Sequence, residues 1–163
     1  MILCLHRSGG FVAKLIRWQT RGKYVHASVI LHHETPTLLR IESMQGSGVR
    51  MLPVPKHEDS DVDYFRVEAT KEQERKVLEF LTSQLGQDYD YKMVLRFVPT
   101  LLDLFWTKRR VTESRSSKRK WFCSELVFAA YQHAGISLLR ETEPFEVSPD
   151  LLSRSPLLIP IKP

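Results

Sequence analysis

The sequence Trp-Phe-Cys-Ser-Glu at positions 121–125 places a cysteine where an amphipathic helix is expected to begin. Unpaired amides and the helix dipole at an N-terminus favour a thiolate, and the same amides can stabilise an oxyanion. Free cysteine is also among the residue types most often buried in protein cores. The position of Cys123 alone therefore leaves two interpretations open, a nucleophile and a structural core residue.

A nucleophilic cysteine needs a base, and the base needs a group that orients it. Residues 23–31 and 37–43 have the composition of two strands, and the Pro36-containing turn between them predicts a hairpin. A turn centred on Glu34 puts His26 directly opposite Glu42, about 5 Å apart at Cβ. A carboxylate beside an imidazole fixes its tautomer and stabilises the imidazolium. The alternative is a surface ion pair of little energetic consequence.

These motifs occur in an order that resembles a known family. In chain order they are His26, Glu42, Gly48-Val49, Gly-Gln-Asp-Tyr-Asp at 86–90, Cys-Ser-Glu-Leu-Val at 123–127 and Ser-Pro-Asp-Leu-Leu at 148–152. The order resembles the circularly permuted, papain-like cysteine hydrolases of the NlpC superfamily, the YiiX/YaeF-like group. In that group the cysteine helix follows the strand histidine, as it does here.

The resemblance implies an α+β, papain-like fold of permuted NlpC type, in which a central antiparallel sheet packs against helices that include the nucleophile's own. It implies Cys123 as nucleophile, His26 as base and Glu42 as the third polar residue. Tyr89 and Ser124 are then expected near the substrate and the oxyanion. We expect one domain over residues 1–163, interrupted by a basic insertion at 107–120, and neither a cofactor nor a metal.

The remaining elements follow from periodicity and turn residues. Beyond the hairpin, the pattern predicts two strands and three helices, at 49–54, 63–68, 70–85, 93–106 and 121–134. Thr70 and Gln73 have the spacing of a capping box, and Gly86 suits the C′ position of the same helix. The apolar stripe expected on this helix is Val77, Leu78, Leu81 and Leu85. His133 is expected on the apolar face of the cysteine helix, and the tail from 144 to 163 as an extended wrap.

The net charge of +5 is concentrated in one place. The segment 107–120 holds seven basic residues against the single acid Glu113, which is +6 and leaves −1 for the rest of the chain. A general nucleic-acid-binding surface is therefore disfavoured. The basic residues are expected at the mouth of the site, where an anionic membrane or cell-wall polymer would be contacted by Lys108, Arg109, Arg110, Lys118, Arg119 and Lys120.

Two cysteines are too few for a disulfide framework, and Cys4 in its short apolar strand is expected to be a core residue. Neither a signal peptide nor a run of about 20 apolar residues is visible. We therefore expect a soluble protein made in the cytoplasm, with later release by another route left open.

Three functions remain for the structure to separate. The resemblance implies a cysteine amidase or peptidase that cleaves cell-wall peptides through a thioester. Distant relatives of the same fold act on lipids as thioesterases, amidases or acyltransferases, which is the second alternative. The third is a non-catalytic module whose basic segment binds an anionic polymer with salt-dependent affinity. The sequence leaves the scissile bond and the oligomeric state open.

Overall fold

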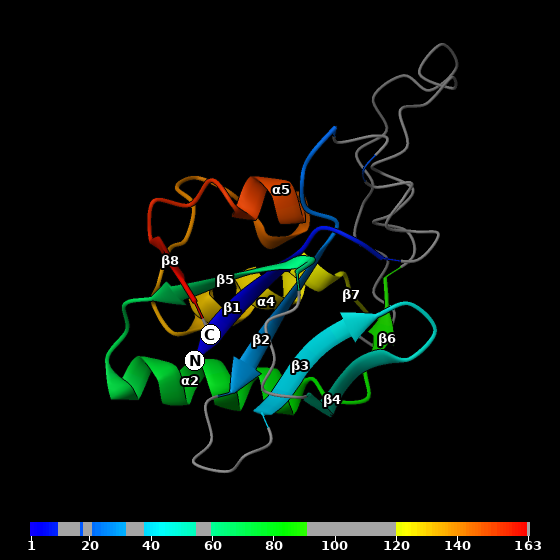
Figure 1. Ribbon diagram of the computed structural model, residues 1–163. Helices are drawn as coiled ribbons and strands as arrows, with labels where there is room; N and C mark the ends of the chain where they lie inside the picture. Colours follow the sequence, from blue (N-terminus) through cyan, green and yellow to red (C-terminus); the bar gives the residue numbers. More distant parts are fainter. Residues whose placement is uncertain (10–16, 18–20, 32–37, 55–59, 91–119, 163) are drawn as a thin grey trace, which may run out of the picture.

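The computed structural model describes residues 1–9, 17, 21–31, 38–54, 60–90 and 120–162 (Figure 1). The helix predicted at 93–106 and nearly all of the basic segment lie outside the described residues. Within them the chain has a mixed α+β fold, in which one six-stranded sheet packs against helices. No helix in these ranges is both long enough and apolar enough to span a membrane.

The sheet is antiparallel throughout. Its strands are β1 (Ile2–His6), β2 (His26–Leu31), β3 (Leu38–Met44), β4 (Gly48–Val54), β5 (Val62–Val67) and β8 (Leu158–Ile161). They lie side by side in the order β4-β3-β2-β1-β5-β8, so that β1 pairs with both β2 and β5. A separate parallel pair is formed by β6 (Asp88–Tyr89) and β7 (Lys120–Trp121). The predicted strands at 49–54 and 63–68 correspond to β4, which begins one residue earlier, and to β5, which begins and ends one residue earlier.

The predicted helix at 70–85 forms as α2 (Lys71–Ser83), and its capping box is confirmed. The Gln73 amide donates to Thr70 Oγ1 at 3.2 Å, and the Thr70 amide donates to Gln73 Oε1 at 2.9 Å. Gly86 adopts a φ of 81° two residues beyond the cap residue Gln84, one position later than predicted. The predicted stripe is correct only in part, because Val77 and Leu81 are fully buried whereas Leu78 and Leu85 are exposed.

The cysteine helix forms as α4 (Cys123–His133) and packs against α2, β2 and β3. Its side chains join those of Leu5, Val29 and Ile41 in the main core on one face of the sheet. On the opposite face Cys4 and Ile30 belong to a second, smaller apolar cluster. His133, predicted on the apolar face of this helix, lies in its last turn; it is exposed, and its ring centroid lies 5.2 Å from that of Phe80.

The tail is more structured than the predicted extended wrap. It contains the 3-10 turn η1 (Pro144–Glu146), the short helix α5 (Pro149–Leu152) and strand β8, which pairs with β5. Ser148 Oγ accepts the Leu151 amide at 3.0 Å and thereby caps α5. The end of the chain therefore supplies the sixth strand of the sheet (Figure 1).

Candidate active site

His26 opens β2, and Glu42 lies near the end of the neighbouring strand β3. The observed register pairs Val29 with Ile41 and Leu31 with Leu39, so the predicted direct opposition of His26 and Glu42 is wrong by two residues. Because side chains alternate between faces with a period of two, an even displacement leaves both residues on the same face. They are diagonal neighbours, and His26 Nε2 lies 3.0 Å from Glu42 Oε2.

Glu42 is fully buried and faces two arginines in addition to His26. Arg50 donates from Nε and Nη2 to Glu42 Oε1 at 3.0 and 2.7 Å, and Arg40 Nε lies 3.4 Å from Oε2. Burial acts to raise the pKa of Glu42, but the hydrogen bond and charge of His26, together with Arg50 and Arg40, lower it to about 2. The carboxylate is therefore charged at any pH near neutrality.

Arg50 was missed in the sequence, although its position follows from the second hairpin. In the β3–β4 register Glu42 is directly opposite Arg50, an opposite-charge cross-strand pair. The turn at Gln45, Gly46 and Ser47 sets this register. Pairing residues 38–44 with 48–54 around this turn places Arg50 opposite Glu42.

Cys123 is the first residue of α4, and buried polar contacts hold the chain on both sides of it. On one side, Ser43 Oγ donates to the Trp121 carbonyl at 2.6 Å. On the other, Ser124 Oγ donates to the Val147 carbonyl at 2.5 Å. Because Ser43 follows Glu42 on β3, the strand of the carboxylate is tied directly to the segment that carries the thiol.

The Cys123 side chain lies close enough to His26 to act on the pKa of the imidazole through its charge and a hydrogen bond. Burial acts to lower the pKa of His26, but the charge and hydrogen bond of Cys123 and the contact with Glu42 outweigh it and raise the pKa to about 9. Because Nε2 faces Glu42, Nδ1 is the ring nitrogen left for the thiol. The structure thus brings the three residues together, with Cys123 1% exposed and the His26 side chain 13% exposed.

A second histidine, which sequence reasoning missed, lies against His26. His6 on β1 is directly opposite His26, with ring centroids 4.9 Å apart, and His6 Nε2 lies 2.9 Å from Ser28 Oγ. Burial, followed by the charges of His26 and Arg40, lowers the pKa of His6 to about 3. His6 therefore stays neutral beside its neighbour. Local patterns contain no signal for this contact, because β1 and β2 are separated by about 20 residues and pair only in the folded chain.

Tyr89 is placed beside Phe122 by a close approach of two chain segments. Its buried ring lies 6.0 Å from that of Phe122, the residue before Cys123. Gly48 makes the approach possible, since it has a φ of 65° and a Cβ there would be 2.2 Å from the Gln87 carbonyl oxygen. The Val49 amide in turn donates to that oxygen at 2.8 Å.

The other predicted site residues are placed differently. Ser124 is fully buried and its hydroxyl donates to Val147, so it is the Ser124 amide that remains for an oxyanion. Lys120 is exposed, with Nζ 3.9 Å from Asp88 Oδ2. The remaining predicted basic contacts lie outside the described residues; they are Lys108, Arg109, Arg110, Lys118 and Arg119. Cys4 is fully buried, as predicted, and burial raises its pKa to about 12.

An open cavity of about 470 Å³ lies near the start of β5 rather than over this cluster. Arg7, Lys23, Tyr24 and Asp63 are among the residues that line it, and Cys123, His26 and Glu42 are not. The contact of Cys123, His26 and Glu42 therefore lies outside this cavity.

Comparison with known proteins places the fold. No family model matches the sequence, and no curated protein matches it. Five chains of solved structures match. One is the crystal structure of the metalloprotein YiiX from Escherichia coli O157:H7, DUF1105, with a TM-score of 0.66 and 18% sequence identity over 99% of this chain and 94% of that one. The chain therefore has a YiiX-like fold, which agrees with the YiiX-like group suggested by the motif order.

Proposed function

We propose that the protein is a cysteine hydrolase of the permuted, papain-like type, with Cys123 as nucleophile, His26 as general base and Glu42 as the residue that orients the imidazole. The contact that carries the proposal runs from a buried carboxylate through an imidazole to a thiol at a helix N-terminus. The order of elements supports the permuted form, because the cysteine helix follows the strands of His26 and Glu42.

In the proposed reaction, His26 accepts the thiol proton of Cys123 and the sulfur attacks a carbonyl carbon. The tetrahedral intermediate carries its negative charge on oxygen, and the Cys123 and Ser124 amides at the start of α4 can donate to it. Collapse breaks the bond to the leaving group, which takes the proton from His26 and leaves a thioester. Water, deprotonated by His26, then attacks the thioester, and the acid and the free thiol are released.

A purely structural role for the cluster is the competing interpretation. Buried ion pairs are poor sources of stability, because desolvation offsets much of their attraction. Glu42 alone could be a structural residue held by Arg50. A structural ion pair does not require a thiol next to the imidazole. The presence of Cys123 beside His26 therefore favours a catalytic role.

A metal ion has no part in the proposed reaction. The neighbour YiiX is described as a metalloprotein. In this chain, no three His, Cys, Asp or Glu side chains within the described ranges are grouped to hold a metal. Glu42 is also a poor ligand, because both of its oxygens face arginines that would repel a metal cation.

The substrate that we propose first is an amide bond of a cell-wall peptide, which rests on the resemblance of the motifs. The same cluster would cleave an ester or thioester of a lipid, since the attacking sulfur and the oxyanion donors are identical. Contact with an anionic surface through the basic segment remains a proposal, because most of that segment lies outside the described residues.

Turnover measured on the two substrate classes tests the proposal. Purified protein is incubated with muropeptides or with acyl lipids, and products are identified by mass spectrometry. Cys123→Ala and His26→Ala should each abolish release of product, and Glu42→Gln should lower it strongly, because the imidazole loses its orienting charge. Full activity in Cys123→Ala would refute the mechanism, and the class that is cleaved identifies the substrate.

A further inference from the structure

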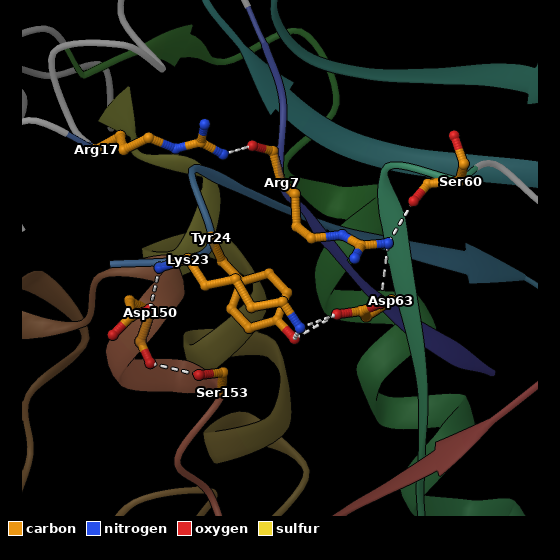
Figure 2. Close-up of polar contacts among 8 residues, drawn as sticks. All are labelled: Arg7, Arg17, Lys23, Tyr24, Ser60, Asp63, Asp150 and Ser153. Atoms are coloured by element: carbon orange, nitrogen blue, oxygen red, sulfur yellow. Dashed lines mark hydrogen bonds and ion pairs between the residues drawn. The ribbon is translucent and has the colours of Figure 1, made fainter. Parts of the chain in front are cut away.

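The segment that leads into His26 is anchored by two carboxylates from distant parts of the chain (Figure 2). The Lys23 amide donates to Asp150 Oδ1 on α5 at 2.7 Å. The Lys23 Nζ and Tyr24 hydroxyl both donate to Asp63 Oδ2 on β5, at 2.8 and 2.5 Å. The approach to β2 is therefore fixed three residues before the proposed base.

The contact with Asp150 is close as well as polar. A Cβ added to Gly22 would lie 2.5 Å from both Cβ and Cγ of Asp150, so only glycine fits against this side chain. The other Asp150 oxygen accepts from Arg154 Nη2 at 3.2 Å, and the Asp150 side chain is 16% exposed. Asp150 thus sits in a closely packed joint between α5 and the chain before β2.

The same stretch of the tail also bonds to Ser124, the residue after the proposed nucleophile. Val147 is fully buried, and its carbonyl accepts from Ser124 Oγ at 2.5 Å, one residue after Cys123. Ser148 then caps α5, which begins at Pro149 and carries Asp150. Only two residues, Ser148 and Pro149, separate the contact with the cysteine helix from the contact with the chain before β2.

We infer that the tail segment 147–150 is a clamp that sets the distance between Cys123 and His26, with Asp150 as its positioning residue. This inference rests on the proposed function of these two side chains. A proton passes between them only at hydrogen-bond distance, and a misplacement of about 1 Å can cost a reaction about 100-fold. The segment 147–150 bonds to the first turn of the cysteine helix through the Val147 carbonyl and to the chain just before β2 through Asp150, so it resists such a displacement.

The clamp is tested by alkylation of Cys123 with iodoacetamide across pH, followed by site-resolved mass spectrometry. Assistance from His26 keeps a thiol reactive at a pH where a free cysteine, with a pKa of about 8.5, is not. Asp150→Ala should slow alkylation of Cys123 at about pH 6 by about tenfold or more and move the profile toward that of a free cysteine. Asp150→Asn should retain most of the rate, since its side-chain oxygen still accepts from the Lys23 amide.

Two control variants separate positioning from general loss of stability. Arg154→Ala removes the other partner of Asp150, an exposed one, and should leave the profile unchanged. Thr70→Ala removes the cap of α2, which lowers stability without touching the joint. Cys123, Glu42 and His6 face His26, Arg40 faces Glu42 and His6, and all of these variants retain the four side chains.

Titration of the His26 ring by NMR provides a second readout that needs no reaction. A folded Asp150→Ala protein with unchanged alkylation and an unchanged His26 titration would overturn the clamp. If Asp150→Ala does not fold, Gly22→Ala tests the joint from the other side, because its methyl group must displace Asp150. A wild-type Cys123 that reacts only as a free cysteine would overturn the proposed function instead, and the His26 titration would still report on the clamp.

Discussion

At the scale of single residues, the charge state of the cluster is set by its neighbours. Glu42 is buried yet held as an anion by His26, Arg50 and Arg40, which lower its pKa to about 2. That anion in turn favours the imidazolium form of His26, as does Cys123. Neutral His6 packs beside His26 without adding a second positive charge. An imidazole in this environment can hold the thiol proton.

These pKa shifts predict how stability depends on pH. His26 has a folded-state pKa of about 9, above the ordinary 6.5, so its contribution to stability is complete below about pH 6.5 and is lost as pH rises through 9. Glu42 has the opposite sign: its contribution is present above about pH 4.5 and is lost as pH falls toward 2. We expect the free energy of unfolding in urea to decrease on both sides of this range.

The variant His26→Ala tests whether His26 causes the decrease in the free energy of unfolding at alkaline pH. It should be less stable than the wild type at about pH 6, and its stability should change less between about pH 6.5 and 9. Glu42→Gln should likewise weaken the decrease on the acid side. An alkaline decrease of wild-type size in a folded His26→Ala protein would show that His26 does not carry the raised pKa.

At the scale of elements, the sequence located the strands and helices better than their register. The capping box of α2 and the start of α4 were predictable because they depend on residues a few positions apart. The β2–β3 register was predicted two residues away from the observed one, because it depends on the geometry of a turn and not on composition. The prediction that His26 contacts Glu42 is still correct, because a register shift of two residues leaves both side chains on the same face. Three further features depend on strand pairing rather than on local patterns. They are the positions of His6 and Arg50 and the strand β8 in the tail.

The bond between Ser43 and Trp121 is an element-scale feature that can be tested by one substitution. Ser43→Ala leaves the buried Trp121 carbonyl without this donor and should lower the free energy of unfolding by about 1 to 2 kcal/mol. Because the bond ties β3 to the segment before Cys123, reactivity of Cys123 should fall as well. Ser47→Ala, at an exposed position in the turn of the next hairpin, is the matched control and should change neither quantity.

At the scale of the whole molecule, the sheet collects the parts of the site from distant positions in the chain. His26 and Glu42 come from adjacent strands, Cys123 comes from a helix almost 100 positions later, and the tail bonds to both regions. A YiiX-like fold therefore accounts for how residues so far apart in sequence meet. The basic segment, which holds the excess charge of the chain, ends at Lys120, the first residue of β7 and three positions before Cys123.

The two cysteines of the chain allow the central claim to be measured within one molecule. Both thiols are buried, but burial raises the pKa of Cys4 to about 12, whereas Cys123 lies at the start of α4 and interacts with His26. The measurement is the rate of iodoacetamide alkylation at each cysteine at about pH 6, in the wild type and in His26→Ala. The proposed mechanism predicts rapid modification of Cys123, none of Cys4, and a rate at Cys123 that falls at least tenfold in His26→Ala. Equal rates at Cys123 with and without the His26 imidazole would contradict it.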